Sequence, residues 1–378
     1  MRPRDRVIRS LQHKEPDKVP LSLGGSAHKI SDSRYLMLKE HYKLDGEGPK
    51  RLTGAYLSYA DNRLLDAIGT DIRYVHLRPP TGYMENKRGD GTWIDEWGLT
   101  HHVIEGGYYE LGGTPLAEAM IDDLDSYPWP DYNDPARYMG LKEEVEDLFN
   151  NTDYAIGAYR PMISGIFEIS HYLRGMEKLL MDLLLDKKFV DTLLWKLTEV
   201  QGEILKQYLD IVGPYVQIVE WADDVGTQNG PMFSPELYKE LVLDKHAYIS
   251  KIVKEKAPGA KLLLHSCGSV KRFIPYFIEA GFDILNPVQP KAKDMKPADL
   301  KAEFGQDISF LGGVDVQQTM RGPVAGVRNE VKQRIEELAP NGGFVLAPSH
   351  NFGDDVPLEN ILAFFETARE FGDYPIAG

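Results

Sequence analysis

The second half of the chain alternates short apolar stretches with longer amphipathic ones, and this alternation restricts the fold more than any other feature. The apolar stretches have the length of buried strands and the amphipathic ones have the length of helices. We predict strands at 214–220, 261–265, 283–286, 308–311 and 343–347. We predict helices from 235 onward and at 271–280, 297–304, 324–338 and 357–371. Strand–helix units of roughly 25 to 40 residues indicate a parallel sheet.

Residue types at two helix ends support these assignments. Ser234 is a good N-cap and Pro235 suits the first helical turn. Pro275 is better placed in the first turns of the 271–280 helix than in its middle, and Gly281 is expected to end that helix.

A parallel sheet of this kind is either open or closed into a barrel. No G-x-G-x-x-G or Walker loop opens any of the helices, so the phosphate-binding signature of many open sheets is missing. A polar side chain instead stands at or just beyond the end of five successive strands: Glu220, His265, Asn286, Asp315 and His350. In a (β/α)8 TIM barrel these positions meet at one mouth, where the chemistry of such enzymes is located. We therefore predict an α/β fold of the TIM-barrel type.

The first half is more irregular, and we predict helical and β-hairpin insertions in it. A helix at 3–13 precedes a strand at 18–23, and 161–210 is almost wholly helical. Turn glycines and four aromatic residues indicate a hairpin at about 83–112; the aromatics are Trp93, Trp97, Tyr108 and Tyr109. These rings either line a substrate pocket or form the core of the hairpin. No linker divides the chain, so residues 1–378 are predicted to form a single domain.

Composition excludes some partners. The formal net charge is −15, which disfavours nucleic acid and anionic membrane surfaces. No apolar run approaches the roughly 20 residues of a membrane span, and the charged residues after Met1 do not resemble a signal peptide. The single cysteine cannot form an internal disulfide. We expect a cytoplasmic protein.

His265 and that cysteine, Cys267, stand two positions apart where the 261–265 strand gives way to a Gly/Ser turn. Positions i and i+2 of a strand face the same side, so both side chains can point at one object. Imidazole and thiolate are both zinc ligands. Two ligands are fewer than a zinc site needs, and a buried cysteine is often only a small apolar side chain.

The chain resembles the uroporphyrinogen decarboxylase superfamily, and within it the zinc-dependent corrinoid methyltransferases. The resemblance covers essentially the whole length and is strongest from 214 to 371. Seven segments carry it: RDRV at 4–7, DKVP at 17–20, DDVGTQ at 223–228, HSCG at 265–268, GFDILNPVQ at 281–289, GGVD at 312–315 and GGFVLAP at 342–348.

The resemblance implies a zinc site. In those methyltransferases a His-x-Cys pair and a later cysteine bind the metal; His265 and Cys267 match the pair, and His350 occupies the place of the second cysteine. Histidine is also a competent zinc ligand, so a set of two histidines and one cysteine with one open position is expected. Replacing a thiolate by a neutral imidazole makes the metal the stronger Lewis acid.

Further site residues are expected around this centre. Glu220 is expected to fill or guard the fourth position, or else to cap a neighbouring loop. Asn286 and Asp315 are candidates for holding the histidines in one tautomer. Asp223 and Asp224 either serve there, act as acid–base groups or cap the loop that follows their strand.

The implied reaction moves a methyl group between a small O-, S- or N-methyl substrate or thiol and a corrinoid carried by a partner protein. Zinc would activate the heteroatom. Two alternatives stay open. A metal-free uroporphyrinogen decarboxylase needs cationic groups for its polyanionic substrate, but no arginine lies between Arg9 and Arg34, where that family carries an arginine-rich segment. The other alternative is a non-catalytic barrel that binds a small molecule.

Overall fold

The central sheet of the protein contains seven parallel strands. In this computed structural model residues 1–46, 57–58, 61–83, 92–103 and 109–376 are described. The sheet has the order β14–β13–β12–β11–β8–β7–β3. Their bounds are β3 (Ile72–Val75), β7 (Ala155–Ala158), β8 (Ile218–Ala222), β11 (Lys261–His265), β12 (Ile284–Asn286), β13 (Ser309–Leu311) and β14 (Phe344–Val345).

The segment around Leu21 lies between the two edge strands of this sheet. Leu21 pairs in parallel with Leu346, just beyond β14, and its carbonyl accepts a hydrogen bond from the backbone N–H of Asp71, just before β3, at 2.8 Å. The predicted strand at 18–23 is therefore present as a short extended segment that bonds to both edges. The curled sheet has no free edge there, as a TIM barrel requires.

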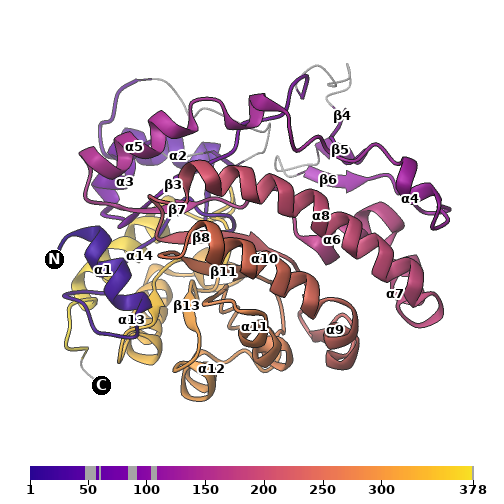
Figure 1. Ribbon diagram of the computed structural model, residues 1–378. Helices are drawn as coiled ribbons and strands as arrows, with labels where there is room; N and C mark the ends of the chain where they lie inside the picture. The colour runs from indigo at the N-terminus through magenta and orange to yellow at the C-terminus, as the bar shows by residue number, and fades with distance from the viewer. Residues whose placement is uncertain (47–56, 59–60, 84–91, 104–108, 377–378) are drawn as a thin grey trace.

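Helices cover the outside of the sheet (Figure 1). Those that follow strands in the barrel are α9 (Pro235–Leu241), α10 (Leu243–Lys256), α11 (Ile274–Ala280), α12 (Pro297–Phe304), α13 (Val324–Leu338) and α14 (Leu358–Phe371). The helical segment before β8 contains α6 (Ile166–Arg174), α7 (Met176–Leu185) and α8 (Lys187–Val212). The other helices are α1 (Pro3–Leu11), α2 (Asp32–His41), α3 (Asn62–Ile68), α4 (Asp123–Ser126) and α5 (Leu141–Asn151).

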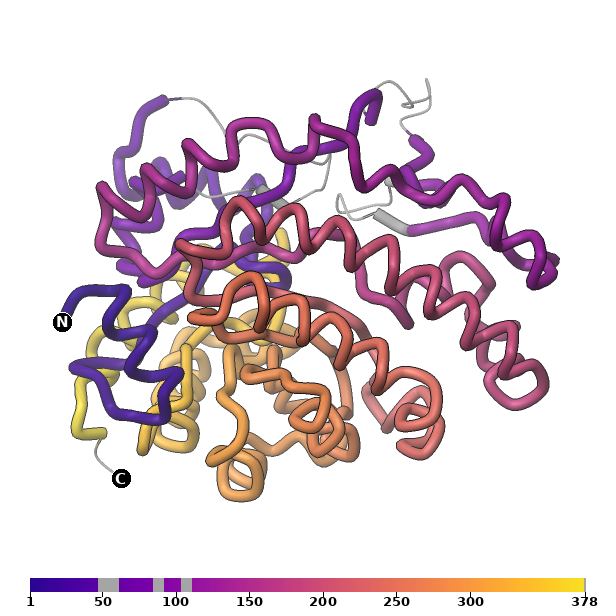
Figure 2. The backbone as a smooth tube through the Cα atoms, viewed as in Figure 1, coloured from indigo at the N-terminus to yellow at the C-terminus, as the bar shows by residue number. Residues whose placement is uncertain are grey.

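The bore of the barrel is filled by apolar side chains. Each of the seven strands contributes one residue to a separate buried cluster, from Ile72 of β3 to Val345 of β14. Val7 and Leu11 of α1 join the same cluster, so this helix closes one end of the bore. Both ends of the described chain contact Asp17 on that side of the molecule: the N-terminal amine lies 2.9 Å from Asp17 Oδ2, and the N–H of Tyr374 donates to the Asp17 carbonyl at 3.0 Å (Figure 2).

Most predicted elements of the second half are confirmed. The strand at 261–265 and the helices at 297–304 and 324–338 have the predicted bounds. The helix at 271–280 begins as a 3-10 turn, Lys271–Phe273, and becomes α-helical at Ile274, so Pro275 does lie in the first turn. The strand predicted at 214–220 is shifted to 218–222, and the one predicted at 343–347 is only 344–345.

The predicted hairpin insertion is a three-stranded antiparallel sheet. It contains β4 (Trp93–Ile94), β5 (Thr100–Val103) and β6 (Tyr109–Gly112) in that order. Trp93 and Trp97 are both buried, whereas Tyr108 lies outside the described residues. Two further strand pairs are β1 (Ile30–Ser31) with β2 (Leu57–Ser58) and β9 (Gly226–Thr227) with β10 (Gly230–Pro231).

One apolar core cluster extends from Val19 near the start of the chain to Ala368 in α14. No helix among the described residues is long and apolar enough to cross a bilayer.

Candidate metal centre

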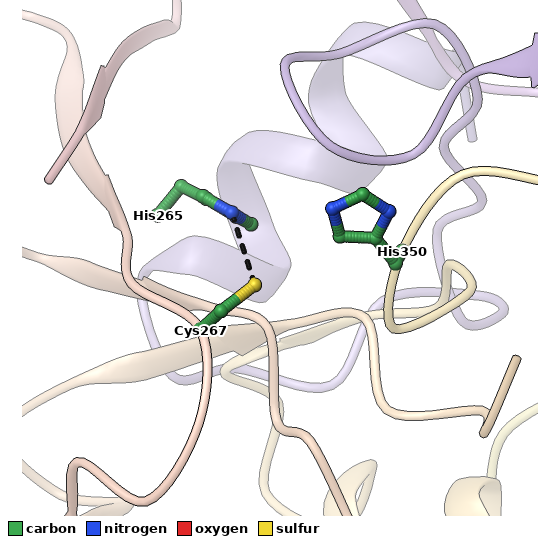
Figure 3. Close-up of side chains that lie close together, drawn as sticks. All are labelled: His265, Cys267 and His350. Atoms are coloured by element: carbon green, nitrogen blue, oxygen red, sulfur yellow. Dashed lines mark hydrogen bonds between the residues drawn. The ribbon is translucent and has the colours of Figure 1, made fainter. Parts of the chain in front are cut away.

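His265, Cys267 and His350 come together at the carboxyl ends of the barrel strands. Strand β11 ends at His265, Cys267 follows two residues later, and His350 lies in the loop after β14. One ligand atom from each residue lies within 4.8 Å of the other two. His265 Nε2 and Cys267 Sγ are 3.3 Å apart, and the His350 ring faces them from its own loop (Figure 3). The sequence-predicted ligands are thus neighbours in space.

Asn286, at the end of the adjacent strand β12, holds the His265 ring. His265 Nδ1 lies 2.6 Å from Asn286 Oδ1, and Asn286 Nδ2 donates to the carbonyl of Leu311 at 3.0 Å. Because an amide oxygen can only accept, His265 carries its proton on Nδ1 and presents the lone pair of Nε2 toward Cys267. Burial lowers the pKa of His265 to about 4, so the ring is neutral at pH 7.

The turn that carries Cys267 is held by side chains from neighbouring strands. The backbone N–H of Cys267 donates to Asp224 Oδ1 at 2.7 Å, and that of Gly268 donates to Gln289 Oε1 at 2.7 Å. Gly268 has φ +86°, and a Cβ there would approach the carbonyl oxygen of Thr227 to 2.7 Å. Glycine is therefore required after the cysteine.

The donor set fits a zinc ion. Tetrahedral zinc with Zn–N near 2.0 Å and Zn–S near 2.3 Å places ligand atoms roughly 3.3 to 3.8 Å apart. The Nε2–Sγ separation already fits, and the separations from His350, which are at most 4.8 Å, would shorten when a metal binds. Burial, Asp224 and Glu168 raise the pKa of the Cys267 thiol. A thiolate at this position therefore needs a compensating cation, which a divalent metal ion supplies.

Asp224 and Glu168 form a pair of carboxyl groups beside the cluster. Asp224 Oδ1 lies 3.9 Å from His265 Nε2, and Glu168 accepts from the Tyr172 hydroxyl at 3.3 Å. Burial and the neighbouring Asp224 raise the pKa of Glu168 to about 8, and burial raises that of Asp224 to about 6. The pair therefore holds a proton near neutral pH.

Asp223 has a structural position. Its two carboxylate oxygens accept from the backbone N–H groups of Phe167 at 3.0 Å and Glu168 at 2.7 Å, and Oδ2 also contacts His246 Nε2 at 2.8 Å. Asp223 thus caps the start of α6, rather than the loop that follows its own strand. The same bonds fix Glu168 beside the cluster.

Glu220 lies inside the barrel and is fully buried. Oε2 accepts from the backbone N–H of Ser26 at 2.9 Å, whereas Oε1 has no hydrogen-bond partner. Burial raises the pKa of Glu220 to about 7. A Cβ on Gly25 would lie 2.4 Å from Oε1, so the chain passes very close to this carboxyl. Among the described residues no hydrogen bond or ion pair joins Glu220 to the three predicted ligands.

Asp315 is placed differently from the expectation. Its carboxylate accepts hydrogen bonds from the backbone N–H groups of Gln317, Gln318 and Thr319 at 2.9 to 3.1 Å. It therefore stabilises the turn after β13 and makes no contact with the histidines in the described part of the chain. Its position just after a strand suggested the site, but its short side chain bonds to its own loop.

Three residues of the mouth were not singled out by the sequence analysis. Tyr159 and Arg160 directly follow β7, and Lys29 lies in the loop after the Leu21 segment. The backbone N–H of Lys29 donates to Asn351 Oδ1 at 2.8 Å, which places Lys29 beside the loop of His350. Like the residues found after the later strands, they are polar residues at a strand end. The sequence does not identify the early strands as strands, so this pattern could not be recognised there.

Two cavities open on this end of the barrel. One of about 410 Å³ is lined by Cys267 and His350 together with polar residues of the loops after β8 and β13. The other, of about 570 Å³, lies between the insertion sheet and the strand ends and is lined by Lys29, Tyr159 and Arg160 among others. The candidate metal centre is therefore reachable by a small molecule.

A known protein family matches a large part of the chain. The family described as "Uroporphyrinogen decarboxylase (URO-D)" matches residues 161–371, more than half of the chain. The chain belongs to the uroporphyrinogen decarboxylase family. That segment contains His265, Cys267 and His350 and every barrel strand from β8 onward.

Within this family the chain is similar to proteins with two different activities. It is 21% identical over 258 residues to a methylated-thiol–coenzyme M methyltransferase of Methanosarcina mazei, covering 68% of this chain and 65% of that protein. It is 28% identical over 181 residues to a uroporphyrinogen decarboxylase of Crocosphaera subtropica, covering 45% of this chain and 48% of that enzyme. The chain thus spans less than two thirds of the length of these curated relatives.

A solved structure confirms the fold. A methyltransferase from Methanosarcina mazei superposes with a TM-score of 0.63 at 17% identity, covering 98% of this chain and 99% of that one. The predicted barrel fold and the predicted superfamily are both confirmed.

Proposed function

We propose that this member of the uroporphyrinogen decarboxylase family is a zinc-dependent methyltransferase. The methyl group would move between a small O-, S- or N-methyl substrate or thiol and a corrinoid carried by a partner protein. The observation that carries the proposal is the convergence of two imidazoles and one thiol within 4.8 Å at the barrel mouth. A metal-free decarboxylase has no need for this donor set.

In this proposal His265, Cys267 and His350 hold the zinc and leave one position open. Zinc bound there acts as a Lewis acid toward the oxygen, sulfur or nitrogen of the substrate. Asn286 keeps Nε2 of His265 directed at the metal, and Asp224 fixes the Cys267 backbone. Both roles are positioning roles, because the contacts run through the ligands.

The acidic pair next to the ligands is suited to proton transfer. A thiol or alcohol that binds as an anion releases a proton, and a methyl ether that is cleaved needs one back. The pKa of Glu168 is raised to about 8 and that of Asp224 to about 6, and Asp224 lies 3.9 Å from His265 Nε2, so we assign this proton to these two carboxyl groups. Glu220, whose pKa is also raised, is a second candidate for such a role or for the fourth position.

The relative from Methanosarcina mazei is named for methylated thiols and coenzyme M, which supports methyl transfer as the reaction class. The corrinoid partner, the single-domain organisation and the cytoplasmic location remain predictions. Zinc is likewise proposed from the donor set and from the family resemblance.

A spectroscopic assay tests the reaction. The purified chain is incubated with a panel of methyl ethers, methylthiols and methylamines and with cob(I)alamin in place of the partner-bound corrinoid. Methylcobalamin formation is followed by visible absorbance. We expect transfer with zinc-loaded wild type, and none with the metal-free chain or with the Cys267→Ala and His350→Ala variants. Lys206→Gln, a surface variant on α8, serves as the control.

Two results would contradict the proposal. Methyl transfer that is equally fast without zinc would show that the metal is not needed for the reaction. Release of carbon dioxide from uroporphyrinogen, with no transfer from any donor in the panel, would favour the decarboxylase activity instead.

A further inference from the structure

The cavity of about 570 Å³ has a size and a lining typical of a small-molecule site. The insertion contributes Trp93 and Trp97, and the strand ends contribute Tyr159 and Arg160. Aromatic rings from two separate parts of the chain thus face one space. A single aromatic ring with substituents fits such a volume.

The acidic residues that line this cavity are already satisfied by the protein. Asp95 accepts from the backbone N–H groups of Trp97 and Leu99 at 2.9 Å and contacts His101 Nε2 at 2.8 Å. Glu96 forms an ion pair with Arg137. These carboxylates therefore do not neutralise Lys29 and Arg160, the two cations that also line the cavity.

These two cations, Lys29 and Arg160, have no ion-pair partner in the described part of the chain. Lys29 is only 8% exposed, and neither Lys29 nor Arg160 lies within 4.0 Å of a carboxylate among the described residues. Arg160 Nε is buried without a hydrogen-bond partner. Both groups flank one ring, with Lys29 Nζ 4.8 Å and Arg160 Cζ 6.0 Å from the Tyr159 centroid. The Tyr159 hydroxyl is a hydrogen-bond partner of both side chains. A hydroxyl does not balance two positive charges that are withdrawn from water, so such groups usually meet an anion as well.

Lys29 and Arg160 both act on Tyr159. Burial alone would raise the pKa of Tyr159, but Lys29 and Arg160 outweigh burial and lower it. Glu168 and Glu220 act on Arg160 from a longer distance, yet their own raised pKa values, about 8 and about 7, leave them largely or partly protonated at neutral pH. An anion is favoured here, and a cationic methylamine is repelled.

The cavity is joined to the candidate metal centre through the backbone. Lys29 is held by Asn351, the residue after His350, and the N–H of Phe352 donates back to the Lys29 carbonyl at 2.8 Å. Arg160 follows β7, which pairs with β8, and β8 pairs with the strand of His265. A ligand anchored between Lys29 and Arg160 is thus close to the loops that carry the predicted zinc ligands.

We propose that this cavity binds a small aromatic carboxylic acid, with its carboxylate between Lys29 and Arg160 and its ring among Trp93, Trp97 and Tyr159. The assignment of this acid as the methyl-bearing substrate rests on the proposed function, whereas the binding site itself does not.

Binding is measured by calorimetry on the metal-free full chain, with three probes of similar size. The probes are 4-methoxybenzoate, its neutral analogue methoxybenzene and the non-aromatic cyclohexanecarboxylate. We expect methoxybenzoate to bind at least tenfold more tightly than methoxybenzene, which lacks the carboxylate that the two cations would bind. It should also bind roughly 2- to 10-fold more tightly than cyclohexanecarboxylate, which keeps the charge but lacks the aromatic ring. Equal binding of methoxybenzene would overturn the anion site, and equal binding of cyclohexanecarboxylate would overturn the aromatic specificity.

Substitutions of Lys29 and Arg160 then test whether these two residues bind the carboxylate. Lys29→Gln and Arg160→Gln are each expected to weaken methoxybenzoate binding at least tenfold. Lys206→Gln removes the same charge at a residue that does not line this cavity, and it should bind as wild type does. Unchanged binding by both cavity variants would refute the assignment. Should either variant fail to fold, the three probes measured on wild type still test whether the cavity binds an aromatic anion.

The two proposals fail separately. Methoxybenzoate binding without any methyl transfer would contradict the proposed function and leave the anion site standing. Methyl transfer from neutral donors, with no methoxybenzoate binding, would contradict the anion site and leave the function standing.

Discussion

Replacing Asn286 by leucine tests whether the histidine is oriented for a metal. The side chains are similar in size, but leucine removes the acceptor for His265 Nδ1 and the donor to the Leu311 carbonyl. Losing a partner that orients a metal-binding histidine typically weakens metal affinity 10- to 100-fold, which corresponds to about 1.4 to 2.7 kcal/mol. We expect this loss in a competition titration with a chromophoric zinc chelator.

The variant also loses stability, so a matched control is needed. The lost hydrogen bonds and the unsatisfied carbonyl should lower the free energy of unfolding by about 2 to 4 kcal/mol. Asn360→Leu is a suitable control, because Asn360 is equally buried and donates to the carbonyls of Met320 and Gly322. It should lose similar stability with unchanged zinc affinity. Wild-type zinc affinity in Asn286→Leu, or an equal loss in Asn360→Leu, would refute the reasoning.

Three further predictions concern stability. Asp223→Ala removes the cap of α6 and should lower the free energy of unfolding in urea by about 2 to 4 kcal/mol; a loss below about 0.5 kcal/mol would contradict the capping role. Glu220 has a folded-state pKa raised from 4.5 to about 7, so wild type should lose stability relative to Glu220→Gln as pH rises from about 4.5 to about 7. The difference should approach the order of 3 kcal/mol, and urea titrations with a pH-independent difference would argue against a buried proton. Gly25→Ala places a Cβ 2.2 Å from the His28 ring and should lower the melting temperature, whereas Gly230→Ala, with open space around it, should not; equal melting would show that the loop near Gly25 adapts.

The sequence predicts best what depends on local periodicity. The helix 324–338 and the strand 261–265 follow from amphipathic and apolar runs with clear ends, and they have the predicted bounds. Strands β3 and β7 are short, and their sequences contain Arg73 and Gly157, so neither stands out as a buried strand. Their pairing in the sheet, rather than their composition, makes them strands.

The candidate site shows the same limit. His265 and Cys267 are two positions apart on one strand, so periodicity alone brings them together, whereas His350 required the family resemblance. Asn286 and Asp315 looked equivalent as polar residues near strand ends, yet one bonds to His265 and the other to its own turn. The importance of Arg160 depends on its having no ion-pair partner within 4.0 Å among the described residues, which only the packed structure reveals.

Zinc K-edge X-ray absorption on the purified chain, with elemental analysis of the same sample, tests the central claim most directly. We predict about one zinc per chain with one sulfur near 2.3 Å and two imidazole nitrogens near 2.0 Å. The sulfur should vanish in Cys267→Ala, and one imidazole should be lost in His350→Ala. A chain that takes up no zinc after reloading, or a metal shell unchanged in both variants, would contradict the account.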